Sequence, residues 1–446
     1  MRASGAGRCV DLLTMRNHLS LPLVLALALL VGCVESDRQT ASVALSPAVV
    51  VIGLDGLEPS LARRLMADGR MPRLQRLVDN GSFATIDCVV GSISPVVWTT
   101  VATGVSPERH GITDFTLDGT PVTSTVRRSP AFWNILPRFG LEVATIGWLA
   151  SWPAEAASGI VISQRTHWGR FDHKVEPEGI LDPGRFRARP ESWPDLLPRF
   201  ASYPYDPDFE RLAESDPRYG LNFLVKNRLI DIAMRDAIYA RAAREIVDNN
   251  RVDLLAVYFQ GTDYVSHGFW KYYEPEPFLE AGWTIDERER AHLGEVIPNY
   301  YSYIDSKIGE LLEAVPDDAL VVVLSDHGFG PALGRFRTKG DFLSGNHRFV
   351  GTLILSGPQI VRDVEQRRQI THFDILPTLL FALGLPQARD LHGYPLLQYF
   401  GDEFLGRQEI TFVDSYGDTA VVDSGATRSE HDEEILKELR SLGYIE

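Results

Sequence analysis

The chain has 446 residues, 44% of them hydrophobic, and a formal net charge of −16 at pH 7. A chain of this length can bury a large core. The acidic balance argues against a nucleic-acid-binding protein, because such a protein needs a basic surface. An anionic substrate would have to be attracted by local cations rather than by the overall charge.

The first 32 residues are predicted to be a signal peptide that is not part of the fold. The apolar run over residues 21–31 follows Arg16, is too short to cross a bilayer and closes on Cys33. Its end, Leu-Val-Gly-Cys, resembles the bacterial lipobox, whose cysteine receives a lipid and becomes the mature N-terminus. The alternative is a plain secretory signal with a chance cysteine. Met15 is an alternative start, since it stands at a more usual distance from the apolar run.

Lipidation of Cys33 would anchor the protein to a membrane of the cell envelope, facing outside the cytoplasm. Residues 33–46 are polar and aperiodic, so they are predicted to be a flexible tether. Val34 stands where an aspartate commonly retains lipoproteins in the inner membrane, which favours the outer membrane. Only Cys88 then remains free, which excludes an intramolecular disulfide framework.

Apolar runs alternate with helical patterns along the rest of the chain. The predicted buried strands cover residues 48–54, 141–148, 252–259, 319–325 and 350–356. The predicted helices cover residues 59–80, 227–250 and 297–315. We therefore predict an α/β fold with a mainly parallel central sheet and helices on both of its faces.

Residues 47–410 are predicted to form one domain, interrupted by an inserted cap at about 164–226. Within it, residues 164–219 hold eight of the 27 prolines and show no clean periodicity. This segment is equally consistent with a cap over the substrate site and with an insertion that has only a structural role. Residues 411–446 are predicted to be a tail, with a charged amphipathic helix over 429–442 that docks on the domain.

Residues of metal-ligand type follow several of the predicted strands. Asp55 comes directly after the first strand, and Asp326 and His327 come directly after the fourth. Asp263 and His267 follow the third strand at a spacing of four, which places both on one face if the segment is helical. The carboxyl ends of parallel strands are where α/β sheets build their sites. Taken singly, an Asp-Gly turn or a surface Asp–His hydrogen bond is an ordinary structural feature.

His347 stands in a Ser-Gly-Asn-His context just before the predicted strand over 350–356. A solvated loop histidine is the commoner fate of such a residue. His347 matters because zinc sites are usually completed by a ligand that is distant in the sequence.

Ser94 is the candidate nucleophile. Serine followed by proline is typical of a helix start, with the Ser94 hydroxyl as the N-cap and Pro95 as the first helical residue. Backbone N–H groups there favour an anion, and a metal would lower the pKa of the hydroxyl. Taken alone, an ordinary helix cap is the commoner explanation. Thr99 and Thr100 would lie deeper in the helix and be less available.

In this order the motifs resemble the alkaline-phosphatase superfamily, and most closely its type I phosphodiesterase/nucleotide pyrophosphatase branch. The resemblance covers about residues 49–396 and includes Thr103-Gly104, the stretch over 107–112 and the Asp/His blocks described above. It extends to the stretch over 374–386, which is similar to the closing helix of the family. It implies an alkaline-phosphatase-like fold.

The resemblance implies a phosphoric ester hydrolase with two divalent metal ions, zinc in the family. By position, Asp263, His267 and His347 are similar to the ligands of the first metal. Those of the second are Asp55, Asp326 and His327, together with the oxygen of Ser94. The family's nucleophile stands nine residues before Thr103, which is again Ser94 and implies a covalent phospho-serine intermediate. The expected substrates contain phosphodiester or pyrophosphate bonds, with no nucleic-acid binding beyond a possible nucleotide substrate.

Ser94 stands where the nucleotide pyrophosphatases commonly carry a threonine, and both are hydroxyls, so the implied mechanism is the same. Two further positions bear on the substrate. The nucleotide pyrophosphatases carry a phosphate-contacting asparagine where this chain has Phe115, which puts nucleotide specificity in doubt and makes Phe115 a candidate substrate-binding residue. The sulfatase branch needs a cysteine or serine and an arginine where this chain has Ile93 and Val97, which argues against a sulfatase. The alternatives are a phosphomonoesterase or phosphonate hydrolase on the same metals, and a catalytically silent, metal-containing surface lipoprotein that binds a phospholipid or polymer.

Overall fold

The computed structural model describes most of the chain after the predicted tether. The described residues are 47–155, 159–165, 175–177, 180–181, 193–333, 343–419, 427–441 and 443–445. The predicted signal peptide, Cys33 and much of the predicted cap therefore lie outside them. Among the described residues, no helix has the length and apolar character needed to cross a membrane.

An eight-stranded sheet forms the centre of the domain, in the order β2-β12-β9-β1-β8-β5-β6-β7. The neighbours β9, β1, β8, β5 and β6 run parallel, while β12, β2 and β7 pair antiparallel at the two ends. The strands are β1 (Val49–Leu54), β2 (Gly81–Asp87), β5 (Val143–Ile146), β6 (Ile160–Ile162), β7 (Val175–Glu176), β8 (Leu254–Phe259), β9 (Leu320–Leu324) and β12 (Val350–Ser356). The predicted α/β fold with a mainly parallel sheet is confirmed.

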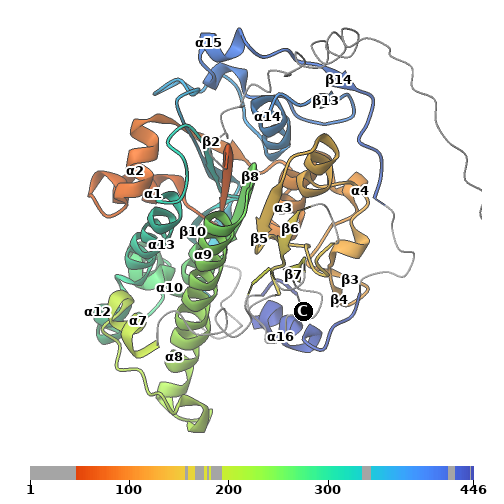
Figure 1. Ribbon diagram of the computed structural model, residues 1–446. Coiled ribbons are helices and arrows are strands. Elements are labelled where there is room, and N and C mark those ends of the chain that lie inside the picture. Colours follow the sequence, from red (N-terminus) through yellow and green to blue (C-terminus); the bar gives the residue numbers. More distant parts are fainter. Residues whose placement is uncertain are drawn as a thin grey trace, which may run out of the picture. The chain divides into compact units, whose positions relative to one another are not determined.

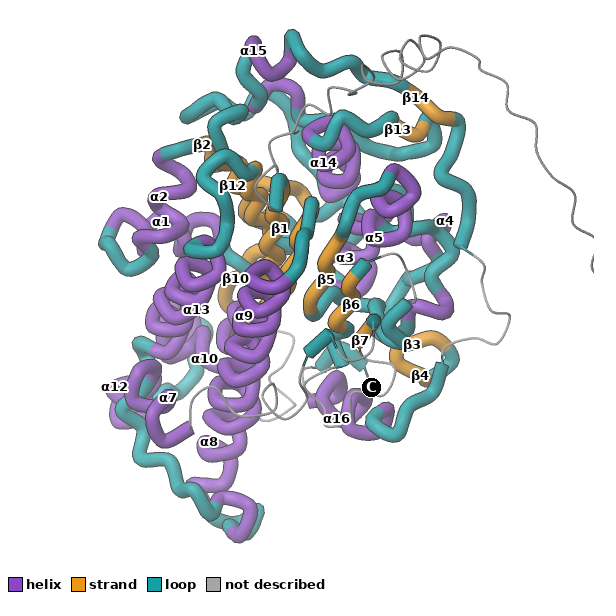
Figure 2. The backbone as a smooth tube through the Cα atoms, in the orientation of Figure 1, coloured by secondary structure: helices purple, strands orange, loops and turns teal. Residues whose placement is uncertain are grey.

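Both faces of the sheet are covered by helices (Figures 1 and 2). Side chains of β1 alternate between the two hydrophobic cores: Val50 and Ile52 belong to one, and Val49 and Val51 to the other. The first core is closed by α1 (Pro59–Ala67), α2 (Pro72–Asp79), α9 (Asp231–Asn249), α10 (Gly261–Tyr273) and α13 (Val296–Leu312). The second is closed by α3 (Ser94–Thr103), α5 (Phe132–Ile135) and α14 (Ile375–Ala382).

The single helix predicted over residues 59–80 is wrong, because the chain forms two helices there. Gly69 adopts a φ of +74°, in the left-handed region that ends helices. Pro72 then opens α2 at a position where its missing N–H costs nothing. The helix predicted over 227–250 is present, but its first turn is a π-helix, η4 (Lys226–Ile230), before α9 begins.

The predicted insertion contributes regular structure where it is described. The strand β7 extends the sheet, and α7 (Trp193–Phe200) packs against α13. Further described elements there are η3 (Phe209–Arg211) and α8 (Pro217–Val225). The role of a substrate cap stays a prediction.

Shorter elements complete the domain. The small strands are β3 (Thr116–Leu117), β4 (Thr120–Pro121), β10 (Gly328–Pro331), β11 (Gly345–Arg348), β13 (Gln387–Ala388) and β14 (Phe412–Val413). The remaining helices are α4 (Pro107–His110), η1 (Ser124–Val126), η2 (Leu136–Phe139), α11 (Glu276–Glu280), α12 (Glu287–Leu293), η5 (His372–Asp374), η6 (Leu397–Tyr399), α15 (Asp402–Leu405) and α16 (Asp432–Ser441). The last of these corresponds to the helix predicted in the tail.

Candidate metal centre

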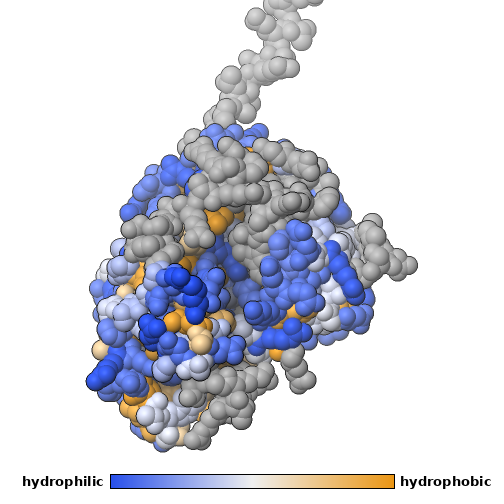
Figure 3. Space-filling view, turned by 90° about the horizontal axis from the view of Figure 1, so that it is seen from below, coloured by the Kyte–Doolittle hydropathy of each residue, from blue (hydrophilic) through white to orange (hydrophobic). Residues whose placement is uncertain are grey.

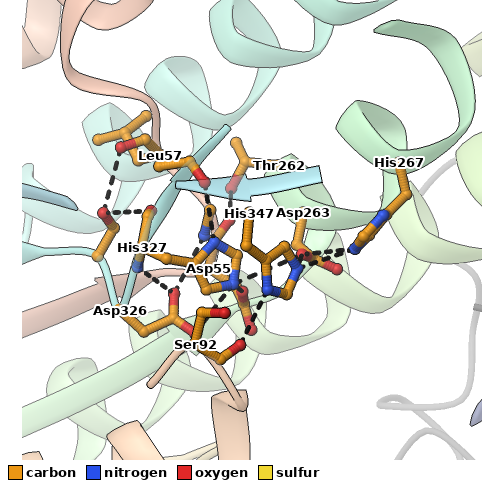
Figure 4. Close-up of polar contacts among 12 residues, drawn as sticks. Asp55, Leu57, Ser92, Thr262, Asp263, His267, Asp326, His327 and His347 are labelled. Atoms are coloured by element: carbon orange, nitrogen blue, oxygen red, sulfur yellow. Dashed lines mark hydrogen bonds and ion pairs between the residues drawn. The ribbon is translucent and has the colours of Figure 1, made fainter. Parts of the chain in front are cut away.

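Three adjacent strands bring three aspartates to one edge of the sheet. Asp55 follows β1, Asp326 follows β9, and Asp263 lies in the first turn of α10, which begins just after β8. Because β1 lies between β8 and β9 and runs parallel to both, the three strand ends meet. All three aspartates are fully buried. Figure 4 shows their side chains converging with those of three histidines.

The histidines come from three local structures. His267 lies one turn after Asp263, and the segment is helical, as its spacing required. His327 leads into β10, and His347 lies on β11, the antiparallel partner of β10. The hairpin therefore returns His347 to the strand ends, although it is distant in sequence from Asp263.

The six residues form two groups of three, and within each group the ligand atoms lie within 4.8 Å of one another. We call Asp55, Asp326 and His327 the inner group, and Asp263, His267 and His347 the outer group. In the inner group, His327 Nε2 lies 3.3 Å from Asp55 Oδ1 and 3.4 Å from Asp326 Oδ2. In the outer group, His347 Nε2 lies 3.1 Å from Asp263 Oδ1 and 2.9 Å from His267 Nε2.

Each histidine turns its other ring nitrogen toward a backbone carbonyl. The Nδ1 atoms of His267, His327 and His347 lie 3.0, 3.1 and 2.9 Å from the carbonyl oxygens of Gly345, Gly328 and Ser92. Only an N–H donates to a carbonyl, so these contacts assign the proton of each neutral ring to Nδ1. The Nε2 lone pairs then point into the site. Histidines that bind metals are held in this way.

The inner group contains three buried atoms without a hydrogen-bond partner: Asp55 Oδ1, Asp326 Oδ2 and His327 Nε2. All three are electron-pair donors in this tautomer. Burial of such atoms without a partner is costly, and a cation among them would remove that cost. Carboxylate oxygens and imidazole nitrogens are the donors that zinc and similar divalent metals take in proteins. The residues present therefore fit a divalent metal.

Burial and mutual repulsion set the charge states of the carboxyl groups. Burial, and then the neighbouring Asp263 carboxylate, raise the pKa of Asp55 well above its usual value. Burial and the charge of Asp55 do the same to the pKa of Asp326. Burial would also raise the pKa of Asp263, but His267 and His347 outweigh it and bring that pKa well below its usual value.

Burial disfavours the protonated form of the two outer histidines. Burial lowers the pKa of His267, and burial together with His327 lowers the pKa of His347. Neutral rings are the form that binds metal.

Ser94 lies beside the inner group at the start of α3, but it is not the N-cap that the sequence predicted. The carbonyl of Ile93 accepts the N–H groups of Val96 and Val97 at 2.9 and 3.1 Å, so Ile93 is the cap and Ser94 is the first helical residue. The Ser94 side chain hydrogen-bonds to Asp55, and this contact favours the charged form of that carboxyl. The hydroxyl thus faces the metal ligands.

The threonines deeper in α3 are committed to the helix itself. The Thr99 and Thr100 hydroxyls donate to the carbonyl oxygens of Pro95 and Val96 at 2.6 and 2.9 Å. This leaves Ser94 as the hydroxyl of α3 that faces the inner group.

Two tyrosines near the ligands were missed by the sequence reasoning. Tyr258, on β8, donates its hydroxyl proton to Asp55 Oδ2 in a short hydrogen bond. Tyr444, near the C-terminus, contacts Asp263 and His267 and stacks on Phe115. The position of Tyr258 near the end of the apolar run over 252–259 could have suggested that it lies close to the strand-end ligands, whereas no local signal marks Tyr444.

A cavity of about 100 Å³ lies next to the start of α3 and is lined by Pro95, Phe115, Arg165, Arg235, Tyr258 and Glu438, among others. A larger cavity, of about 740 Å³, lies by Ala319 and Ser356, at the opposite ends of β9 and β12 from the ligands. The smaller cavity is the one adjacent to the candidate chemistry.

The chain was compared with known protein families, curated proteins and solved structures. Residues 49–361, more than half of the chain, match the family model "Type I phosphodiesterase / nucleotide pyrophosphatase". No curated protein matches the chain.

Solved structures with similar folds include a phosphonoacetate hydrolase from Sinorhizobium meliloti 1021 (16% identity, TM-score 0.41, 64% of this chain and 57% of that one). They also include a 2-O GAG sulfatase and a putative sulfatase from Bacteroides thetaiotaomicron VPI-5482, each with 13% identity, a TM-score of 0.46, and 78% and 73% of the two chains covered. The chain thus spans 57% of the length of the phosphonoacetate hydrolase.

Proposed function

The chain belongs to the type I phosphodiesterase/nucleotide pyrophosphatase family, and we propose that it hydrolyses phosphodiester or pyrophosphate bonds with two divalent metal ions, with zinc as the first choice. The family is metal-dependent and acts on phosphoric esters. The proposal adds the number of metals, the nucleophile and the class of bond.

One observation carries the proposal: six inward-facing ligand residues adjoin a serine hydroxyl at a helix start. The inner and outer groups share a border, since His327 Nε2 also lies 3.8 Å from Asp263 Oδ1. The rings of His327 and His347 stack with their centroids 3.5 Å apart. Two adjacent ligand sets of this kind suit an in-line displacement at phosphorus, in which the attacking and leaving oxygens both need stabilisation.

The chain's residues take the following roles in this proposal. Ser94 Oγ attacks phosphorus and gives its proton to solvent, while the bond from phosphorus to the leaving oxygen breaks and that oxygen takes up a proton. Water then attacks phosphorus, the bond from phosphorus to Ser94 Oγ breaks, and Oγ is reprotonated as the phosphate product leaves. Asp55, hydrogen-bonded by Ser94 and Tyr258, orients the nucleophile. Divalent metals in the two groups would lower the pKa of the attacking hydroxyl and neutralise charge on the phosphoryl oxygens.

The test is metal analysis of the protein lacking residues 1–33, paired with turnover of a bis-aryl and a mono-aryl phosphate. We expect two metal equivalents and a preference for the diester. Ser94→Ala should lower kcat by about a thousandfold, because the covalent route is lost, while Thr99→Val serves as the control in the same helix. A strong monoester preference would replace the diesterase by a phosphomonoesterase. Two bound metals without turnover of any phosphoester or phosphonate would instead indicate a silent binding protein.

We further propose that the chain is held at the cell envelope by a lipid on Cys33, which lies outside the described residues. The lipobox-like sequence supports this proposal. Labelled palmitate should be incorporated into the wild-type chain and not into Cys33→Ala, which should also leave the membrane fraction. Equal labelling of both would exclude the anchor.

A further inference from the structure

The C-terminal end of the chain reaches the outer group, and the proposed function does not use it. Helix α16 ends at Ser441, and Gly443, two positions further on, has a φ of +72°, in the left-handed region. The N–H groups of Gly443 and Tyr444 donate to the carbonyls of Arg440 and Leu439, both at 3.0 Å. A glycine-ended helix of this kind reverses the chain, and here it directs Tyr444 toward the metal ligands.

The helix is held in place by ion pairs with arginines of the domain. Arg165 and Asp432 lie 3.0 Å apart, with 3% and 14% of their side chains exposed. Arg235 and Glu438 lie 3.1 Å apart, and Glu438 also accepts the Tyr264 hydroxyl proton. Removing one partner of an ion pair with this degree of burial leaves the other charge buried without compensation, which strongly destabilises the packing of the helix. The side of the molecule that carries α16, at the bottom of Figure 1, is largely hydrophilic where it is described in Figure 3.

The Tyr444 hydroxyl joins the ligand atoms of the outer group. Its oxygen lies 2.9 Å from Asp263 Oδ2 and 2.9 Å from His267 Nε2. The ring stacks on Phe115 with the centroids 4.4 Å apart and the planes within 9°. Tyr444 is therefore fixed at both its ring and its hydroxyl.

The phenol has too few protons for the contacts it makes. Since His267 donates through Nδ1, its Nε2 is an acceptor, and so are both oxygens of Asp263. The single phenol proton can be donated either to His267 Nε2 or to Asp263 Oδ2. The acceptor that does not receive it then faces a lone pair of the phenol oxygen. A cation within the cluster would accept the lone pairs of the phenol oxygen, of His267 Nε2 and of the Asp263 carboxylate together. Contacts of 2.9 to 3.4 Å among the donors resemble the separation of about 3.3 Å between ligands around tetrahedral zinc.

We propose that Tyr444 supplies a further oxygen ligand to the metal held by Asp263, His267 and His347, and that the docked tail thereby closes the site. The inference rests on the proposed function, because a catalytic metal keeps one position open for a substrate oxygen or water. With Tyr444 in that position, substrate binding requires the tail to move aside. The tail carboxylates also neutralise Arg165 and Arg235, two cations beside the cavity that an anionic substrate would need.

The first test measures metal binding rather than activity. The metal-free chain is titrated with Co²⁺ and with Zn²⁺ against a competing chelator, as wild type, Tyr444→Phe and the exposed control Tyr394→Phe. Phenylalanine keeps the stack on Phe115 and removes only the oxygen. We expect one of two metals to bind about tenfold more weakly in Tyr444→Phe, with a changed Co²⁺ visible spectrum and no change in the control.

The second test concerns closure and uses Glu438→Gln, with Glu433→Gln on the exposed face of the same helix as control. Loss of the Glu438 charge should loosen the tail and raise kcat/KM for a bis-aryl phosphate several-fold at saturating metal. Unchanged metal affinity and spectrum in Tyr444→Phe would overturn the assignment of Tyr444 as a ligand, and unchanged activity in Glu438→Gln would overturn closure. A wild-type chain that binds fewer than two metals would instead contradict the proposed function itself.

Discussion

The inner and outer groups contain the same kinds of ligands but satisfy them differently. In the outer group, every ligand side chain has a neighbour from the chain itself: His267 and His347 face each other, and Tyr444 contacts Asp263. In the inner group, Asp55, Asp326 and His327 each keep a buried atom without a partner. The difference lies in the tail, which contacts the outer group through Tyr444.

This difference shows that two similar ligand sets can depend on a metal to different degrees. The inner group has no substitute for a cation, and burial raises the pKa of both of its carboxyl groups. The outer group can share the proton of the Tyr444 phenol, although the Nε2 lone pairs of its two histidines still face each other. The inner group should therefore gain more stability from its metal, and the outer group should exchange its metal more easily.

The largest effect should come from removing a carboxylate of the inner group. Asp326→Asn should lower kcat/KM by about a thousandfold, because several kcal/mol of transition-state stabilisation depend on the metal held there. With metals chelated, however, the variant should unfold at the same or a higher temperature than wild type, since one buried carboxyl is gone. The measurements are steady-state kinetics and thermal unfolding in chelator. A clear loss of stability in chelator would contradict the view that the inner group is strained without a cation.

An intermediate effect should appear as a difference in pH dependence. The raised pKa values of Asp55 and Asp326 mean that the metal-free inner group keeps protons that a metal must expel. Its metal affinity should fall by about tenfold per pH unit and per proton as the pH is lowered.

The outer group should change less over the same range, because the pKa values of Asp263, His267 and His347 are lowered. Calorimetric titration of His347→Ala, which isolates the inner group, and of Asp326→Ala, which isolates the outer group, separates the two. Parallel pH profiles would contradict the comparison.

The smallest effect should come from a residue that only orients an inner ligand. Tyr258→Phe removes the donor to Asp55 Oδ2 and should weaken metal binding at the inner group by about tenfold, with the outer group unchanged. Tyr303→Phe, which loses a hydrogen bond to the Ala233 carbonyl at similar burial, is the matched control. Equal losses in both variants would point to a general packing effect.

Much of the site could be predicted from the sequence because its ligands stand beside strong local signals. Asp55, Asp263 and Asp326 follow apolar runs, and parallel strands bring such positions to one edge. Tyr444 could not be predicted, since it lies 177 positions from His267 and beyond the end of the predicted amphipathic helix. The ion pairs that dock this tail are tertiary and leave no pattern in the sequence.

The errors in the fold concern helix boundaries. The Ser-Pro signal placed the start of α3 one residue late, because the Ile93 carbonyl already accepts the first helical hydrogen bonds. The apolar periodicity of 59–80 continues across Gly69, whose backbone conformation decides against one helix. In both cases a single backbone geometry outweighs the pattern.

The position of β1 between β8 and β9 has a consequence for how the protein folds. Asp55 and Tyr258 are 203 positions apart, and Gly56 and Asp326 are 270 apart. Contacts of such separation carry a large loop-closure entropy cost, so we expect them to form late, after the intervening chain has been ordered. A metal at the inner group therefore binds a chain whose central sheet is already assembled. It should slow unfolding while leaving the folding rate nearly unchanged, so that metal availability sets the lifetime of the native protein rather than the speed of its formation.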